Sequence, residues 1–141
     1  MPYEPKPFEA FRIGDAVTFS KTITEADITL FAGVSGDHHP VHVDEQYAKK
    51  SRFGGRIAQG MLTASLLSTT AGLILATPGA ILVSQDLRFK RPVRPGDTVT
   101  ARSEIVELLP EKRRLRWKST IVNQDGEVVI ESESVGQKDL A

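Results

Sequence analysis

The chain has no cysteine among its 141 residues, which excludes disulfide bonds, thiolate metal sites and cysteine nucleophiles. It also has no net charge, because eighteen basic and eighteen acidic residues cancel. A field strong enough to recruit nucleic acid or an anionic membrane surface is therefore not expected. The start, Met1 to Pro5, lacks the basic and apolar regions of a secretory signal, so we expect a cytoplasmic protein.

Length and organisation indicate one domain covering residues 1–141, since no repeat, low-complexity segment or linker divides the chain. Such a domain buries roughly two-thirds of the surface of its unfolded chain. The stretch from Gly60 to Ala76 has no charged residue. As a helix it would reach only about 25 Å, short of the ~30 Å membrane core, and it carries serines and threonines. We expect a helix buried on nearly all sides.

Alternating apolar and polar residues predict strands near residues 16–23, 81–90, 98–105, 114–121 and 128–135. In the second of these, Ile81, Val83, Leu87 and Phe89 are expected to share one covered face. Turn sequences separate the last four strands, and such short connections favour antiparallel neighbours. Thr24 is predicted to cap a helix that ends at Gly33 or Gly36. A second short helix should start at Asp44 and carry Tyr47 and Ala48 inward. The fold class is α+β, an antiparallel sheet curled around a long central apolar helix.

All three histidines lie in the segment from Asp37 to His42, beside a carboxylate. Proton transfer and metal binding are the two leading interpretations. Gly36 and Pro40 favour a loop on which Asp37 and His42 can converge on one water molecule. Adjacent side chains rarely converge on one ion, and no fourth ligand is evident beyond Asp37, so we expect no metal.

Three segments carry a family resemblance: Phe31 to His42, which matches the pattern GDxNPxH at all but one position, Arg56 to Leu62, and Phe89 to Asp97. The chain resembles the MaoC-like, R-specific enoyl-CoA hydratases of the hot-dog fold, from about residue 14 to about residue 135. His39 departs from the family pattern, which usually has asparagine. A neutral histidine can supply one donor and one acceptor, as asparagine does, although with different reach.

The resemblance implies reversible hydration of trans-2-enoyl thioesters. In this reading Asp37 and His42 share the attacking water, and the backbone N–H of Gly60 at the start of the apolar helix binds the oxyanion. His39 and Pro40 are implied to lie beside the substrate. The resemblance further implies an acyl-CoA or acyl carrier thioester as substrate, no separate cofactor, and a homodimer formed by sheet extension.

Substrate binding rests on two further groups of residues. Ser68 and Ala71 line the acyl pocket by family alignment, although small residues could equally let the sheet pack closely. Four cations around one strand and its turn are candidates for the CoA phosphates, namely Arg88, Lys90, Arg91 and Arg94, and Arg52 and Arg56 precede the apolar helix. Most charged clusters, however, are solvated faces. Two other functions stay open. One is a hot-dog acyl-CoA thioesterase, and the other is a catalytically silent acyl-CoA-binding module.

Overall fold

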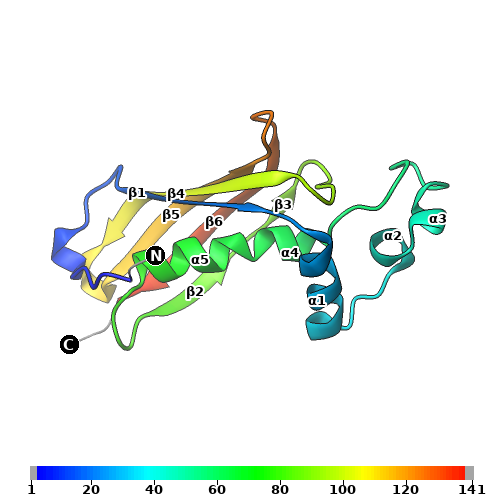
Figure 1. The fold of residues 1–141 in the computed structure, drawn as a ribbon. Helices are drawn as coiled ribbons and strands as arrows, with labels where there is room; N and C mark the ends of the chain where they lie inside the picture. Colours follow the sequence, from blue (N-terminus) through cyan, green and yellow to red (C-terminus); the bar gives the residue numbers. More distant parts are fainter. Residues whose placement is uncertain (1–2, 139–141) are drawn as a thin grey trace.

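The computed structural model describes residues 3–138 and shows one antiparallel sheet curled over a layer of helices (Figure 1). The strands are β1 (Ala16–Thr22), β2 (Ile81–Gln85), β3 (Arg88–Phe89), β4 (Thr98–Leu109), β5 (Arg114–Val122) and β6 (Val128–Gln137). The helices are α1 (Glu25–Ser35), α2 (Pro40–Val43), α3 (Glu45–Ala48), α4 (Gly60–Ala64) and α5 (Leu66–Ile74), with 3-10 turns at Phe8–Ala10 and Pro110–Lys112. The predicted α+β class is confirmed.

The sheet follows the order β1-β4-β5-β6-β2, and β3 also pairs with β6. Strands β4, β5 and β6 are neighbours in sequence and pair antiparallel, as the short turns predicted. Every second residue of β5 is buried against the helices, from Leu115 through Trp117 and Ser119 to Ile121. This alternation is the reason that the strand could be predicted from its sequence.

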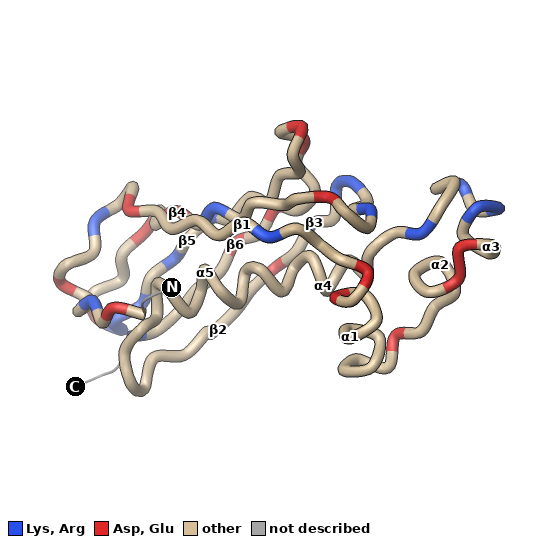
Figure 2. Tube along the Cα trace, viewed as in Figure 1, with Lys and Arg blue, Asp and Glu red and all other residues tan. Residues whose placement is uncertain are grey.

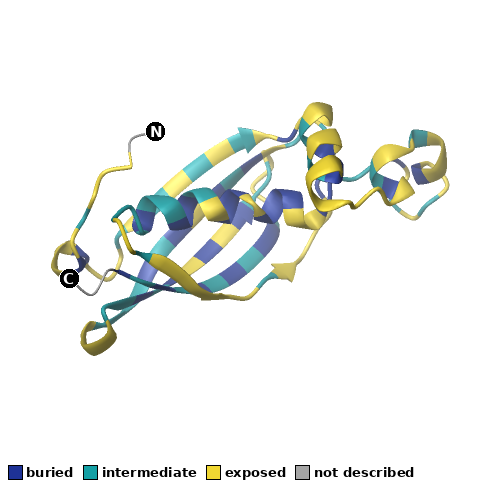
Figure 3. Ribbon diagram, turned by 90° about the horizontal axis from the view of Figure 1, so that it is seen from below, coloured by how far each residue is buried: buried dark blue, intermediate teal, exposed yellow. Residues whose placement is uncertain are grey.

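Helices α4 and α5 lie along the concave face of the sheet and form one rod interrupted at Ser65 (Figure 3). Ser65 itself is helical in backbone conformation, and its hydroxyl donates to the carbonyl of Leu62 at 2.5 Å. The predicted long helix is therefore present. The expectation of burial on nearly all sides was wrong, because Met61, Ser65 and Ser68 are exposed. Among residues 3–138, no helix is long and apolar enough to cross a membrane.

Two groups of buried side chains hold the helices on the sheet. One surrounds α4 and the start of α5 and includes Ile28, Leu67, Val99, Ile121 and Ile130. The other lies at the far end of α5 and includes Phe8, Phe11, Ala71, Ile74 and Trp117. Burying this many aliphatic and aromatic side chains is the main source of stability in a domain of this size.

Strand β2 occupies an edge of the sheet and is exposed along its whole length (Figure 3). The sequence predicted that Ile81, Val83 and Phe89 would share a covered face. In the structure Ile81 is 56%, Val83 39% and Phe89 52% exposed, so that expectation was wrong for this chain taken alone. An exposed apolar edge strand is a surface suited to pairing with another strand.

Helix α1 begins as predicted at Thr24, whose hydroxyl accepts from the N–H of Asp27 while the Asp27 carboxylate accepts from the N–H of Thr24. This backbone hydrogen bond, assisted by Lys21 at 2.9 Å, lowers the pKa of Asp27. Gly36 ends the helix at a φ of 80°, a conformation that glycine adopts without strain. The chain then turns directly into the segment that carries Asp37.

Helix α3 begins where the sequence predicted, because the Asp44 carboxylate accepts from the N–H of Tyr47 at 3.1 Å. Ala48 is buried as expected. Tyr47 is 49% exposed, so the prediction that it points inward was wrong. Helices α1, α2 and α3 gather at the end of the molecule where α4 begins (Figure 1).

Candidate active site

His42 lies in the single-turn helix α2, whose start is fixed by His39 and Pro40. The Nδ1 atom of His39 accepts from the N–H of Val41 at 3.1 Å and so caps the helix. Pro40 occupies the first turn, where its missing N–H is not needed. The sequence predicts a loop from Gly36 to His42, and this prediction was wrong for Pro40 to His42, which lie in the helical turn. His39 thus does the capping that an asparagine commonly does at a helix start.

The ring of His42 is fixed by a backbone carbonyl. Its Nδ1 lies 2.7 Å from the carbonyl oxygen of Ile57. Because a carbonyl oxygen can only accept a hydrogen bond, Nδ1 must carry a proton and donate it. In the neutral ring the lone pair then belongs to Nε2, which is the atom that faces Asp37. The side chain of His42 is only 12% exposed, so this orientation is held by its surroundings.

The Nε2 atom of His42 lies 3.8 Å from Oδ2 of Asp37. This is too long for a direct hydrogen bond, and both atoms are acceptors when the ring is neutral and the carboxylate is ionised. A water molecule placed about 2.8 Å from each atom would see them at an angle of roughly 85°, near the angle between its own O–H bonds. The two side chains can therefore accept hydrogen bonds from both O–H groups of one water molecule, which leaves a lone pair of its oxygen free to attack.

Gly60 begins helix α4, and among the described residues its N–H makes no hydrogen bond. The first N–H groups of a helix have no partner within it and are available to an external acceptor. The ring of Phe89 lies against this point of the chain. A Cβ atom on Gly60 would fall 2.9 Å from Cε1 of Phe89. Glycine is the residue that permits this close approach.

His42 and Gly60 line the same cavity of about 290 Å³. Thr63, Phe89 and Ile130 also line it, and so do three exposed cations: Arg52, Lys90 and Arg91. The cavity combines an apolar interior with cations at its exposed side, a combination suited to an acyl chain with a charged carrier. Asp37 does not line the cavity, but its Oδ2 atom lies 3.8 Å from Nε2 of His42, which does.

The four cations predicted to bind phosphates do not form one site. Lys90 and Arg91 line the cavity, where Lys90 lies 3.8 Å from Glu131 and Arg91 lies 3.5 Å from Glu127. Arg94 donates to the carbonyl oxygens of Phe53 and Gly55. Arg88 pairs with Asp86 at 3.4 Å and does not line the cavity. The structure therefore brings only two of the four to the cavity.

Arg52 is the cavity-lining cation that forms no ion pair among residues 3–138. It lies over the ring of Phe53 at 4.9 Å. Figure 2 shows basic residues both at the turn after β3 and in the stretch after α3, on the two sides of this end of the molecule. An unpaired guanidinium is better placed to receive a phosphate than the paired ones.

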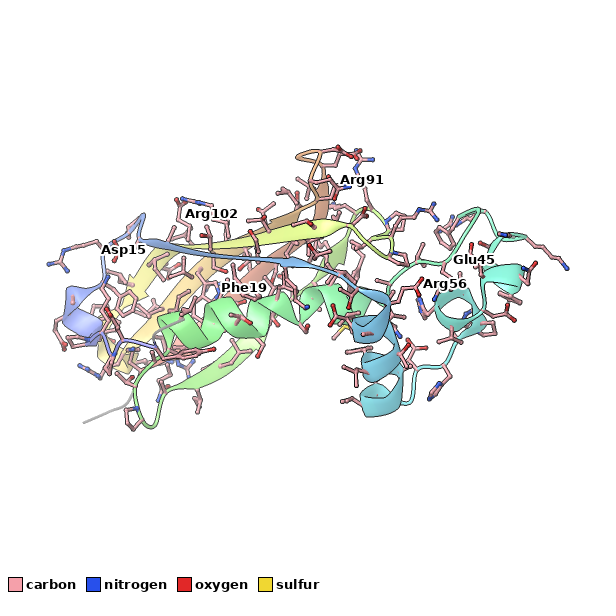
Figure 4. All side chains as sticks on the ribbon, viewed as in Figure 1. Asp15, Phe19, Glu45, Arg56, Arg91 and Arg102 are labelled. Atoms are coloured by element: carbon pink, nitrogen blue, oxygen red, sulfur yellow. The ribbon has the colours of Figure 1, made fainter. Side chains whose placement is uncertain are left out.

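Arg56 braces the segment that leads into α4. Its guanidinium binds Glu45 at 3.1 Å and also binds Glu25, so it joins α3 and α1 to this segment (Figure 4). The hydrogen bond from Arg56 lowers the pKa of the Glu45 carboxyl group. Two backbone hydrogen bonds hold the same segment. The N–H of Ile57 donates to the carbonyl oxygen of Val41 at 3.2 Å, and the N–H of Ala58 donates to the carbonyl oxygen of Val93 at 2.7 Å.

The two residues predicted to line an acyl pocket lie away from this cavity. Ser68 is exposed on α5, and Ala71 is buried with Phe8 and Trp117 at the far end of the helix. Neither lines the cavity that holds His42 and Gly60. Their role in binding an acyl chain stays a prediction. Among residues 3–138, no group of three or more histidine, aspartate or glutamate side chains is arranged to hold a metal ion.

Three groups at the site had no role in the sequence interpretation: the carbonyl of Ile57, the side chain of Thr63 and the ring of Phe89. A backbone carbonyl has no sequence signal of its own. The alternation of residues 81–90 predicts Phe89 on the covered face of a strand. Thr63 looked like one more small residue of the apolar helix, and only the structure shows that its hydroxyl is buried beside the cavity.

Comparisons with known proteins agree on one family. Residues 9–131 match the model of the MaoC like domain. The chain is 48% identical to an (R)-specific enoyl-CoA hydratase of Rhodospirillum rubrum over 90% of this chain and 88% of that protein. It is 41% identical to a 3-hydroxybutyryl-CoA dehydratase of Methylorubrum extorquens over 91% and 81%, respectively. Its structure is similar to that of the (R)-hydratase from A. caviae involved in PHA biosynthesis, with a TM-score of 0.88, 34% identity, and 93% and 99% of the two chains covered.

Proposed function

Since the chain belongs to the MaoC-like domain family, we propose that it catalyses the R-specific hydration of trans-2-enoyl thioesters and the reverse dehydration of 3-hydroxyacyl thioesters. It is an enzyme of the enoyl-CoA hydratase class, with the hot-dog fold that the resemblance implied. The observation that carries the detailed proposal is the orientation of His42. Its Nδ1 is held by a carbonyl oxygen at 2.7 Å, which leaves Nε2 to face Asp37 across 3.8 Å.

Hydration of an enoyl thioester requires a hydroxyl group on Cβ and a proton on Cα. In the proposed reaction both O–H groups of the water molecule donate hydrogen bonds to Asp37 and His42. Its oxygen forms the bond to Cβ as the C=C π bond breaks and the electron pair moves toward the thioester oxygen. One proton of the water stays on this oxygen as the new hydroxyl group, and the other passes to one of the two side chains, which then delivers it to Cα as the electron pair forms the new C–H bond. Atoms balance without any other reactant, and dehydration uses the same groups in reverse order.

The negative charge that develops on the thioester oxygen requires a hydrogen-bond donor. We assign this role to the N–H of Gly60, which has no partner among residues 3–138; Gly60 lines the cavity with His42. A donor of this kind does not have to reorganise during the reaction, and removing one oxyanion donor typically lowers kcat by about 10²–10³-fold. The positive end of the helix dipole, at the N-terminus of α4, also stabilises this negative charge.

The carrier end of the substrate would lie against the exposed cations of the cavity. We propose a CoA thioester, with Arg52 as the residue that contacts its phosphates most directly, supported by Lys90 and Arg91. The relatives named above are described as acting on CoA thioesters, which supports this choice over an acyl carrier protein. The chemistry needs no further cofactor, because water is the only co-reactant.

We also propose that the enzyme is a homodimer formed through the exposed edge strand β2. Ile81, Leu82 and Val83 are 56%, 44% and 39% exposed, and the outer edge of β2 pairs with no described strand. A second copy that pairs with this edge would cover these side chains. Sedimentation of the wild type should give twice the monomer mass, and Leu82→Lys should shift the protein toward monomer. A wild type that sediments as a monomer would contradict this assembly.

The proposed reaction is tested with crotonyl-CoA and a longer enoyl-CoA, following the loss of conjugated absorbance together with the release of free thiol. Hydration removes the absorbance without releasing thiol. Free thiol without hydration would indicate the thioesterase instead, and neither signal would indicate a silent acyl-CoA-binding module.

Variants test the site itself. Asp37→Asn and His42→Ala should each lower kcat by about 10²–10⁴-fold while circular dichroism stays unchanged. His38→Ala is the matched control, because His38 is an exposed neighbour in the same segment, and its side chain makes no hydrogen bond or ion pair among residues 3–138. Near-normal rates in either catalytic variant would overturn the assignment of the pair.

A further inference from the structure

The hydroxyl of Thr63 is buried without a partner. Thr63 is 1% exposed, and among the described residues its Oγ1 atom makes no hydrogen bond. Two other hydroxyls on the same rod have partners. Ser65 donates to the carbonyl of Leu62 at 2.5 Å, and Thr70 donates to the carbonyl of Leu67 at 3.2 Å. A buried hydroxyl that lacks a partner destabilises the folded state, so its presence calls for an explanation.

Thr63 lines the same cavity as Gly60 and His42. It follows Gly60 by three residues, so the two positions lie on the same face of the helix. Side chains on a helix lean toward its N-terminus and cover the turn that precedes them. The hydroxyl of Thr63 therefore leans toward the turn that starts at Gly60. Its other neighbours on the cavity wall include Ala58, Val93 and Ile130, which offer no side-chain acceptor.

An enoyl thioester has few groups that could satisfy this hydroxyl. Beyond the reacting end, a simple acyl chain carries no polar atom. At the reacting end the thioester oxygen is the strong acceptor, and it gains negative charge as water adds to Cβ. A hydroxyl beside the N–H of Gly60 would meet the same oxygen and strengthen its hydrogen bond as that charge develops.

We propose that Thr63 is a second hydrogen-bond donor to the thioester oxygen, acting with the N–H of Gly60. This inference rests on the proposed function and adds a catalytic residue to it. Thr63 touches the substrate at the atom where charge develops, so its contribution falls mainly on kcat and less on KM. The hydroxyl has no partner among the described residues because the substrate provides one.

The test compares Thr63→Val, which keeps the shape and removes the hydroxyl, with Thr63→Ser, which keeps the hydroxyl. Thr63→Val should lower kcat for crotonyl-CoA about 10- to 100-fold with KM changed less than about threefold. Its melting temperature should be unchanged or higher, because an unpartnered hydroxyl has been removed. Thr63→Ser should keep kcat within about threefold of the wild type. Together these results would support the proposal.

Thr70→Val is the matched control, since Thr70 is equally buried but its hydroxyl also accepts from Ser103 at 2.9 Å within the protein. It should lower the melting temperature and leave kcat unchanged. An active wild type whose Thr63→Val variant keeps its kcat, or changes only in KM, would overturn this inference alone. A wild type that does not hydrate enoyl-CoA would instead overturn the proposed function on which it rests.

Discussion

Replacing Gly60 by alanine is the sharpest test of the oxyanion site. The added Cβ atom would lie 2.9 Å from Cε1 and 3.1 Å from Cδ1 of Phe89. Ordinary contacts of this kind begin near 3.4 Å, so the ring or the start of α4 must move by about 3.4 − 2.9 = 0.5 Å. This movement would displace residue 60, whose N–H is proposed to donate a hydrogen bond to the thioester oxygen.

The effect on folding should be small. Phe89 is 52% exposed and can turn toward solvent, and alanine is favoured over glycine in a helix by up to about 1 kcal/mol. Overpacking typically destabilises by about 1–3 kcal/mol, so the two effects largely offset one another. We expect the free energy of unfolding to change by less than about 2 kcal/mol. The effect on activity should be larger, because loss of one oxyanion donor lowers kcat by about 10²–10³-fold and a displaced donor by about 10- to 100-fold.

The assay measures kcat for crotonyl-CoA in Gly60→Ala, in Phe89→Ala and in the double variant. Removing the ring should relieve the contact, so the double variant should recover most of the kcat of Phe89→Ala. Gly33→Ala is a suitable control, since its Cβ would meet nothing within 4 Å and its φ is not positive. The reasoning is refuted if Gly60→Ala keeps kcat within twofold of the wild type, or if its loss persists without the Phe89 ring.

Three further predictions follow from local geometry. His39→Asn should keep kcat within about threefold of the wild type, because either side chain can accept a hydrogen bond from the N–H of Val41. His39→Ala removes the cap, so it should lower kcat and destabilise the folded protein by about 1 kcal/mol. Equal kcat in the two variants would contradict the capping role. The pKa of Asp27 is lowered on folding, so the ionised carboxylate contributes to stability above pH ~4, and this contribution is lost as the pH falls below that value. Urea unfolding should show Asp27→Asn about 1 kcal/mol less stable than the wild type at pH 7. An equally large difference at pH 3 would contradict this prediction. Gly136→Ala places a Cβ atom 2.7 Å from the ring of Trp117 and should destabilise by about 1–3 kcal/mol, measured by thermal unfolding, whereas an unchanged melting temperature would show that the core yields there.

The sheet and the first helix could be predicted because their signals are local. Strand β5 alternates buried and open residues along its whole length, and Thr24 with Asp27 forms the expected cap of α1. Strand β2 was predicted from a similar pattern, with Ile81 and Val83 on one face, and yet it is exposed throughout. Alternation predicts that a strand forms, but it cannot say whether the neighbour that covers it lies in the same chain. The proposed dimer accounts for this difference.

The candidate site was predictable in its side chains and not in the contacts that orient them. Asp37, His42 and Gly60 were identified from a motif, and the structure brings His42 near the other two. The choice of Nε2 as the free nitrogen of His42 depends on the carbonyl of Ile57, fifteen residues further along the chain. Whether Ser68 faces the cavity depends on how the helix is rotated about its axis. Because the sequence predicts a helix buried on nearly all sides, it does not indicate which side faces the cavity.

The departure at His39 has a physical explanation in the structure. The position requires an acceptor that caps α2, and the Nδ1 atom of histidine provides one. The capped helix positions His42, whose Nδ1 bonds the carbonyl of Ile57 three residues before Gly60. The backbone from Ile57 to Gly60 thus connects the carbonyl group that orients His42 with the N–H group proposed to bind the oxyanion. This segment is itself held by a hydrogen bond from the N–H of Ile57 to the carbonyl oxygen of Val41. A substitution that preserves the cap preserves this spacing, so histidine at position 39 is compatible with the hydratase reaction.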